Sequence, residues 1–280
     1  MNKIQAYYDA CTEDEWGRLE RDPFHHLEWR ATLACLRAHL PSMGLILDAG
    51  GGPGRYTREL CRQGYDVALL DLSPKSIALA REKLAAEGPA VASHLQRCEV
   101  GDVRDLSRFS DQTFDAVLCL GPLSHLTSVE DRRKAISELV RVAKPGAPVI
   151  VAVIGFYAVL CVVLKQFSSE LTDPARCALY LTGDQHTTGP GFPDAHFFRP
   201  EELQSLAEEA GLHTAELRAC EGLSANLSEA TNALREHDDG RWEQWLKILD
   251  ATQHDPAVVA TSQHFLYVGR TPAGHATGVR

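Results

Sequence analysis

The chain lacks several features that mark common classes of protein. None of its eight cysteines stands in a C-x-x-C pair, so their spacing suggests neither a zinc site nor a disulfide framework. Basic residues are in deficit: 28 lysines and arginines accompany 38 aspartates and glutamates, for a formal net charge of −10. Nucleic acid is therefore disfavoured as the main partner, because phosphate binding requires a basic surface. Several cysteines lie in apolar stretches, as reduced cysteines of a cytoplasmic protein commonly do.

The sequence also has little that points to a membrane. No apolar stretch follows the first residues, so no secretory signal is expected. The longest apolar run, 149–164, is shorter than the roughly 18 residues that indicate a membrane-spanning helix. Because this run follows a Pro-Gly turn at 145–146, we interpret it as a buried strand and the start of an apolar helix. We predict a cytoplasmic protein without a membrane partner.

What is present is a regular alternation of strand and helix patterns in an ordinary globular composition, 44% apolar and 24% charged. The expected strands are 45–47, 67–70, 94–100, 114–120 and 149–154. The expected helices are 22–40, 55–62, 73–88 and 129–142. This alternation predicts an α/β fold, with a parallel sheet and helices on both of its faces.

The alternation is interrupted at residues 156–200. An apolar helix is expected there, followed by a loop rich in glycine, proline, histidine and aromatic residues. Such a long irregular stretch in a compact domain is usually functional or mobile. A helix at 200–210, a strand at 212–220, helical residues 223–252 and a final strand at 263–269 are expected to follow.

The turn after the first expected strand is rich in glycine. Residues 48–54 read Asp-Ala-Gly-Gly-Gly-Pro-Gly, which allows a sharp turn and lets a ligand lie against bare backbone. A nicotinamide or flavin fingerprint, G-x-G-x-x-G, does not fit from Gly50, because Arg55 replaces its third glycine. The pattern that fits is D-x-G-x-G-x-G, formed by Asp48, Gly50, Gly52 and Gly54.

Two further carboxylates follow the next two strands. Asp71 ends the second expected strand, where a carboxylate can accept hydrogen bonds from both ribose hydroxyls of an adenosine. Asp102 follows the third strand, and its carboxylate could accept from the amino group of an adenine. The glycine loop with Asp71 and Asp102 is much more specific for a nucleoside than the loop alone.

With these motifs, the chain resembles the class I S-adenosylmethionine-dependent methyltransferase superfamily over roughly residues 43–270. The segments that carry the resemblance are 48–54, 67–71, 101–103, 114–126 and 141–146. The resemblance implies a Rossmann-like, seven-stranded, mostly parallel sheet of order 3-2-1-4-5-7-6, whose last strand is antiparallel. It also implies S-adenosyl-L-methionine as the cofactor.

Within the superfamily, the chain looks most similar to bacterial small-molecule methyltransferases. That similarity implies an N-terminal helical cap (1–42) and a methyltransferase domain (43–270) with an insertion after the fifth strand (156–200). The insertion would form the acceptor pocket, and residues 271–280 would be a flexible tail. The predicted cofactor-binding residues are Asp48, Gly50, Gly51, Gly52, Gly54, Tyr56, Asp71, Leu72, Ser73, Asp102, Val103, Leu120 and Gly121.

The segment after the fourth strand, 121–125, should face the transferred methyl group, since ligands of such sheets bind beyond the carboxyl ends of the strands. It is not the N-P-P-Y type sequence that is common among methyltransferases of planar amino groups. His125 is the predicted catalytic residue, as general base or orienting group, with a helix-capping histidine as the alternative. Weaker candidates for the acceptor pocket or for closure over the cofactor are Tyr7, Tyr8, His25, His26, His186 and His196.

We predict an enzyme that transfers a methyl group to nitrogen or oxygen of a small metabolite. No cluster of histidines and carboxylates has ligand spacing, so no metal site is expected. Three alternatives stay open: a methyltransferase of RNA or protein, a non-catalytic S-adenosylmethionine-binding module, and, disfavoured by Arg55, a nicotinamide oxidoreductase. Homodimer formation is left open by the sequence.

Overall fold

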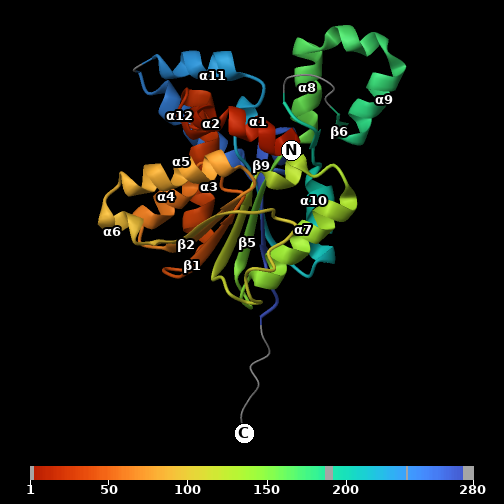
Figure 1. The fold of residues 1–280 in the computed structure, drawn as a ribbon. Helices are drawn as coiled ribbons and strands as arrows, with labels where there is room; N and C mark the ends of the chain where they lie inside the picture. Colours follow the sequence, from red (N-terminus) through yellow and green to blue (C-terminus); the bar gives the residue numbers. More distant parts are fainter. Residues whose placement is uncertain (1–2, 187–191, 238, 274–280) are drawn as a thin grey trace.

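The computed structural model describes residues 3–186, 192–237 and 239–273. Its centre is a seven-stranded sheet of order β3-β2-β1-β4-β5-β9-β8, with β9 antiparallel to both of its neighbours (Figure 1). The strands are β1 (Leu45–Ala49), β2 (Asp66–Asp71), β3 (Leu95–Val100), β4 (Ala116–Leu120), β5 (Pro148–Ile154), β8 (His213–Ala219) and β9 (His264–Arg270). Counted along this sheet alone, the order is 3-2-1-4-5-7-6, which confirms the predicted fold class.

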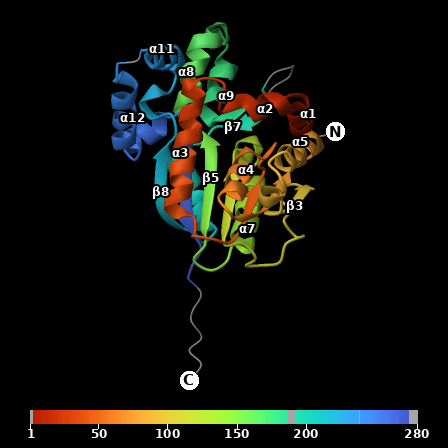
Figure 2. The same cartoon turned by 90° about the vertical axis from the view of Figure 1, so that its left-hand side faces the viewer.

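Helices cover both faces of the sheet, and the strand residues alternate between the two resulting cores. Leu47 and Val117 face a core that includes α7 (Val129–Val142) and α10 (Pro200–Glu209). Ile46 and Leu118 face the opposite core, which includes α3 (Pro23–His39) and α4 (Arg55–Arg62). Figure 2 shows α3 crossing this face of the sheet. Burial on both faces explains why the strands read as nearly continuous apolar runs.

The helices begin where the sequence signals predicted. Ser73 accepts a hydrogen bond from the Ser76 N–H, and Pro74 occupies the first turn of α5 (Pro74–Ala85). Asp22 caps α3 in the same way, through the His25 N–H. The remaining short helices on the sheet are α6 (Pro89–Ala92) and α13 (Pro256–Thr261).

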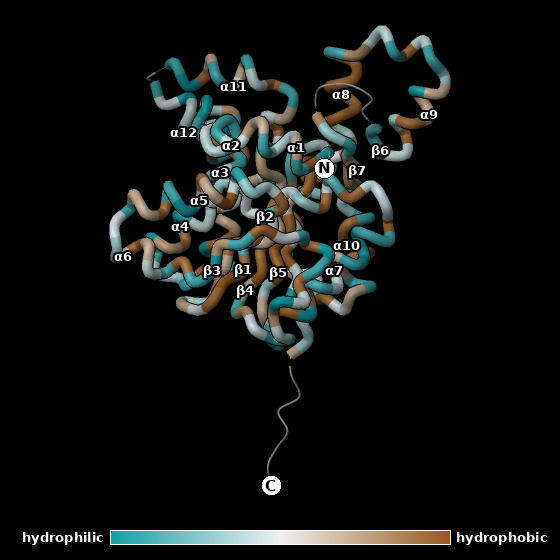
Figure 3. The backbone as a smooth tube through the Cα atoms, in the orientation of Figure 1, coloured by the Kyte–Doolittle hydropathy of each residue, from teal (hydrophilic) through white to brown (hydrophobic). Residues whose placement is uncertain are grey.

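The helices beyond the carboxyl ends of the parallel strands, at the top of Figure 1, include an N-terminal group and the insertion after β5. The N-terminal group is α1 (Lys3–Ala10) and α2 (Thr12–Arg18), together with the start of α3. The insertion after β5 contains α8 (Phe156–Gln166), η2 (Ser168–Thr172), α9 (Pro174–Thr182) and the short strands β6 (Asp184–Gln185) and β7 (Ala195–His196). Figure 3 shows α8 as a largely hydrophobic helix.

Three segments differ in detail from the sequence predictions. The helical stretch 223–252 is divided into η3 (Gly222–Ser224), α11 (Ser228–Arg235) and α12 (Arg241–Thr252), and Gly240 has a φ of +81° just before α12. The insertion contains α9 and the β6–β7 pair, which the loop composition concealed. Thr271 is buried and its N–H donates to the Ala147 carbonyl, whereas most of the predicted tail, 274–280, lies outside the described residues.

The apolar run 149–164 is divided between β5 and α8, as predicted. Within the described ranges, no helix combines the length and the apolar character that crossing a bilayer requires.

Candidate functional site

A large cavity lies beyond the carboxyl ends of the parallel strands. Its volume is about 1620 Å³, which exceeds the roughly 300–1,000 Å³ typical of pockets for one small ligand. One part of its lining, here called the glycine-loop wall, consists of residues 50–53, 71–73, 101–104 and 120–122. A second part, here called the assembled wall, comes from α1 to α3, the end of β5 (152–154), the insertion, Glu221, Gln263 and His264. The cavity is therefore large enough for two ligands side by side.

The glycine loop approaches the neighbouring strand end too closely for any side chain. Gly50 has a φ of +82°, and a Cβ added there would lie 2.0 Å from Pro122 Cγ. Gly52 has a φ of +56° and no atom of another residue within 4 Å of an added Cβ. The loop thus packs against β4 on one side and leaves bare backbone at the cavity on the other.

Asp71 lies at the mouth of this loop. Its Oδ2 accepts from the Gly52 N–H at 2.8 Å and its Oδ1 accepts from the Ser73 N–H at 2.8 Å. Burial raises the pKa of Asp71 to about 6, although both N–H donors favour the ionised form. A carboxylate held in this position has further lone pairs with which to accept hydroxyl groups from the cavity.

Asp48 supports the loop from below. Its side chain is fully buried and accepts from Thr57 Oγ1 at 2.7 Å, while its other oxygen has no partner among the described residues. Burial raises the pKa of Asp48 to about 6. A Cβ at Gly51 would lie 2.3 Å from the Asp48 carboxylate, so the carboxylate fills the space beneath the loop. Asp48 and Gly54 do not line the cavity, whereas the other eleven predicted cofactor-binding residues do.

Asp102 is in contact with a cation that the sequence did not single out. Although burial acts in the opposite direction, hydrogen bonds from Arg104 lower the pKa of Asp102. The two side chains are 2.6 Å apart, and Arg104 also pairs with Asp131 at 2.7 Å. Asp102 is therefore an ionised acceptor at the edge of the cavity, shared with the guanidinium group.

His125 is buried beneath α1 and uses both of its ring nitrogens. Tyr8 Oη lies 2.6 Å from His125 Nε2, and His125 Nδ1 lies 3.3 Å from the Asp194 carbonyl oxygen. Because a carbonyl only accepts, Nδ1 carries the proton and Nε2 accepts from the Tyr8 hydroxyl. Burial lowers the pKa of His125, which favours this neutral form. Asp9, also on α1, accepts from Ser73 Oγ, so α1 is held against the glycine-loop wall.

A second histidine of the cavity, His264, was not predicted. His264 Nδ1 lies 2.7 Å from Glu221 Oε1 and 3.5 Å from Glu28 Oε2. Glu28 forms a two-pronged ion pair with Arg18, and although burial opposes ionisation, Arg18 helps lower the pKa of Glu28 to about 2. These residues are far apart in the sequence, and the only available signal was a histidine at the start of a strand at the carboxyl edge of the sheet.

The remaining predicted residues take different positions. Tyr7 lines the cavity and stacks edge-on against Phe192, and His25 and His186 also line it, whereas His26 does not. His196 is buried outside the cavity lining and lies 2.7 Å from both Asp184 and Glu202. The apolar part of the assembled wall includes Ile154, Val159, Val162, Val163, Phe167, Leu179 and Phe197.

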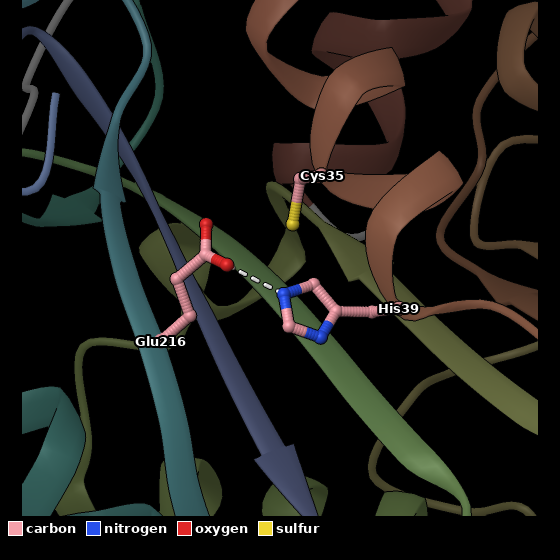
Figure 4. Close-up of side chains that lie close together, drawn as sticks. All are labelled: Cys35, His39 and Glu216. Carbon is pink, nitrogen blue, oxygen red and sulfur yellow. Dashed lines mark hydrogen bonds and ion pairs between the residues drawn. The ribbon is translucent and has the colours of Figure 1, made fainter. Parts of the chain in front are cut away.

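A cysteine, a histidine and a glutamate also come together away from the cavity. Figure 4 shows His39 bonded to Glu216, with the Cys35 thiol beside them. Arg218 binds the same carboxylate at 2.5 Å, and burial raises the pKa of Cys35 to about 12. A salt-bridged network accounts for this arrangement without a metal ion, and the predicted absence of a metal site stays a prediction.

Comparisons with known proteins agree with this geometry. Residues 46–146 match a family described as a methyltransferase domain. A glycine/sarcosine N-methyltransferase from Aphanothece halophytica is 36% identical over 100 residues, which span 35% of this chain and 36% of that relative. A ubiquinone biosynthesis O-methyltransferase from Thiobacillus denitrificans is 30% identical over 172 residues, spanning 61% and 66% of the two chains.

The chain thus spans only about a third of the length of the glycine/sarcosine enzyme. The solved structure of an S-adenosylmethionine-dependent methyltransferase from Methanosarcina mazei extends the likeness of fold, with a TM-score of 0.58 at 20% identity, over 85% of this chain and 97% of that one. Taken with the strand order and the glycine loop, these findings show that the chain carries a methyltransferase domain and has the fold of the class I S-adenosylmethionine-dependent methyltransferases.

Proposed function

We propose that this chain is an enzyme that transfers a methyl group from S-adenosylmethionine to nitrogen or oxygen of a small molecule. The observation that carries the proposal is the Asp71 carboxylate bonded across the glycine loop, at one end of a cavity large enough for a second ligand. Bare backbone beside a carboxylate suits an adenosine, whose ribose hydroxyls are donors. The adjoining space suits the acceptor.

The glycine-loop wall would hold the cofactor. Gly50 to Gly52 would lie against it, Asp71 would accept from the ribose, and Asp102 with Val103 would contact the adenine. Asp48 and Gly54 would act indirectly, by holding the loop in shape. When bound, S-adenosylmethionine supplies an electrophilic methyl group, so the chain has to align the acceptor, exclude water and remove a proton where the acceptor requires it.

Tyr8 and His125 would close the site rather than take a proton. Their mutual hydrogen bond occupies His125 Nε2, and the pKa of Tyr8 is raised by burial, so its phenol stays protonated. We assign His125 the orienting part of its two predicted roles, in which it holds α1 over the reacting groups.

A small acceptor is supported by the space beside the glycine-loop wall and by the relatives. The relatives named above are, by their names, an N-methyltransferase of glycine and sarcosine and an O-methyltransferase of ubiquinone biosynthesis. The assembled wall combines an apolar part from the insertion with many acidic side chains, and the chain as a whole is acidic, which disfavours RNA. Cytoplasmic location and homodimer formation stay predictions.

Calorimetry tests the cofactor assignment. S-adenosylhomocysteine should bind the wild-type chain, and Asp71→Ala should weaken binding at least about 100-fold, because the ribose loses a charged acceptor worth roughly 1.5–3 kcal/mol per hydrogen bond. Asp66→Ala is the matched control: Asp66 begins the same strand, is exposed and lies outside the cavity lining. Binding of NAD alone, or equal affinities for both variants, would overturn the assignment.

Methyl transfer is tested separately. S-adenosylmethionine labelled with ¹³C in its methyl group is incubated with the protein and a bacterial extract separated by size. Label is expected in the metabolite fraction. Label only in RNA or protein would favour the macromolecular alternative, and tight S-adenosylhomocysteine binding without any transfer would favour a non-catalytic module.

A further inference from the structure

The imidazole of His264 is held at one nitrogen and unengaged at the other. His264 is the first residue of β9 and pairs with Ile154, the last residue of β5. Its Nδ1 donates to Glu221 Oε1 at 2.7 Å, and the ring lines the cavity with about 20% of the side chain exposed. Across the described ranges, no residue forms a hydrogen bond with its Nε2. This nitrogen is therefore available to a ligand in the cavity.

Glu221 is fixed in place by contacts of its own. It is buried, and its Oε2 accepts from the His264 N–H at 2.8 Å and from Ser262 Oγ at 3.1 Å. The carboxylate therefore holds the ring in the tautomer that carries its proton on Nδ1, which leaves the Nε2 lone pair of the neutral ring for an incoming proton. A carboxylate, an imidazole and a free second nitrogen are the components of an oriented general base.

The surrounding charges favour the protonated ring. Burial acts against the imidazolium ion, but Glu28 and Glu221 outweigh burial and the nearby Arg18, so the pKa of His264 is raised. Glu28 itself is influenced by His25 on α3. His264 is thus a stronger base than a free histidine, whereas burial lowers the pKa of His125 and both nitrogens of that ring are engaged.

His264 lies within reach of the transfer site. Its strand is separated from β4 only by β5, so two spacings of about 4.8 Å separate the strand ends of β4 and β9. The link is direct: Ile154, which pairs with His264, donates its N–H to Ser124 Oγ at 3.0 Å, and Ser124 precedes His125. An acceptor bound beyond the ends of β4 and β5 would lie between the two histidines.

We propose that the acceptor presents a hydroxyl group and that His264 Nε2, oriented by Glu221, removes its proton. The inference rests on the proposed function. The hydroxyl O–H bond breaks and its proton moves to Nε2, while the oxygen bonds to the methyl carbon and the electron pair of the carbon–sulfur bond stays on sulfur. The sulfonium becomes a thioether, and His264 later releases one proton to solvent.

A hydroxyl is the group for which such a base matters most. A neutral amine attacks through its own lone pair and loses a proton only after the new bond has formed. A neutral hydroxyl is a poor nucleophile, and its proton has to leave as the bond forms. An oriented base in the acceptor half of the cavity therefore points to O-methylation.

The labelled transfer described above also identifies the atom that is methylated, before the acceptor itself is known. The ¹³C and ¹H shifts of the new methyl group together distinguish an oxygen-bound from a nitrogen-bound methyl. An O-methyl signal is expected. An N-methyl signal would overturn this inference and leave the proposed function standing, whereas no transfer at all would overturn both.

Substitutions test the role of the base. With the same extract fraction, His264→Asn should lower the transfer rate about 10²–10⁴-fold, the range for general-base catalysis, with S-adenosylhomocysteine affinity within about threefold of wild type. His39→Asn is the matched control, since His39 is another carboxylate-paired histidine and lies outside the cavity lining. Equal rates for the two variants would remove His264 from the mechanism.

Titration of the His264 ring by NMR does not require turnover. It also distinguishes a base from a residue with a purely structural role. The ring should titrate above the ordinary histidine pKa in the wild-type chain and lower in Glu221→Gln, and the acidic limb of the rate profile should move with it. If Glu221→Gln does not fold, added imidazole should restore transfer to His264→Ala. A ring that titrates normally, or a rate profile that does not follow it, would contradict the proposal.

Discussion

The two walls of the cavity are built in different ways. The glycine-loop wall consists of the segments that follow β1, β2, β3 and β4, each of which places three or four residues at the cavity. The assembled wall joins residues from the N-terminal helices, the insertion and the start of the last strand. The residues of the glycine-loop wall can be recognised from short sequence motifs, whereas those of the assembled wall come together only in the folded chain.

His125 and His264 show the same contrast. His125 ends the short 3-10 helix that follows β4, in a segment where the strand pattern already predicts a ligand. His264 gains its chemical character from Glu221, Glu28 and Arg18, none of which is its sequence neighbour. The more obvious histidine has both nitrogens engaged, and the less obvious one keeps a nitrogen for the cavity.

The largest effect is expected at Gly50, which tests whether the glycine-loop wall holds the cofactor. Gly50→Ala should reduce S-adenosylhomocysteine affinity about 100-fold, because alanine is strained by roughly 1–3 kcal/mol at a φ of +82° and its Cβ would meet Pro122. Gly64→Ala, with a φ of +88° and open space around its Cβ, is the control and should lose stability only. Calorimetry on both variants decides: equal affinities would mean that the glycine-loop wall is not the cofactor side.

A smaller effect is expected at Tyr8. Tyr8→Phe removes the hydrogen bond to His125, with a net value of roughly 0.5–1.5 kcal/mol, so the methyl-transfer rate should fall about tenfold or less. S-adenosylhomocysteine affinity should change little. Tyr7→Phe, on the same helix, should leave the rate unaltered, and a fall of similar size there would show that α1 acts through packing alone.

The smallest effect concerns pH. Asp71 has a raised pKa of about 6, so the ionised acceptor is present above that value and is lost as the pH falls through it. S-adenosylhomocysteine affinity should drop roughly fourfold between pH 7.5 and pH 5.5, the fall in the ionised fraction. Asp71→Asn should bind weakly at both values; a dependence that survives this substitution would be assigned to Asp48, whose pKa is also about 6.

The strands of the sheet and the residues of the glycine-loop wall could be predicted from the sequence for a physical reason. Strands buried on both faces give apolar runs, caps such as Ser73 mark helix starts, and a turn that approaches Pro122 closely accepts only glycine. The β6–β7 pair and α9 escaped prediction because they are short and lie in a stretch of loop-like composition. The pairing of His264 with Glu221 could not be predicted, since it depends on which distant segments the strand order brings together.

The position of β9 has a consequence for how the protein forms. β9 is the last of the described strands to be synthesised, yet it lies inside the sheet and is the only described strand that pairs with β8. Until it is inserted, β5 is left with an open edge and β8 has no neighbour to pair with. The half of the molecule that carries the glycine-loop wall can thus assemble during synthesis, whereas the assembled wall is completed only after β9 has been inserted.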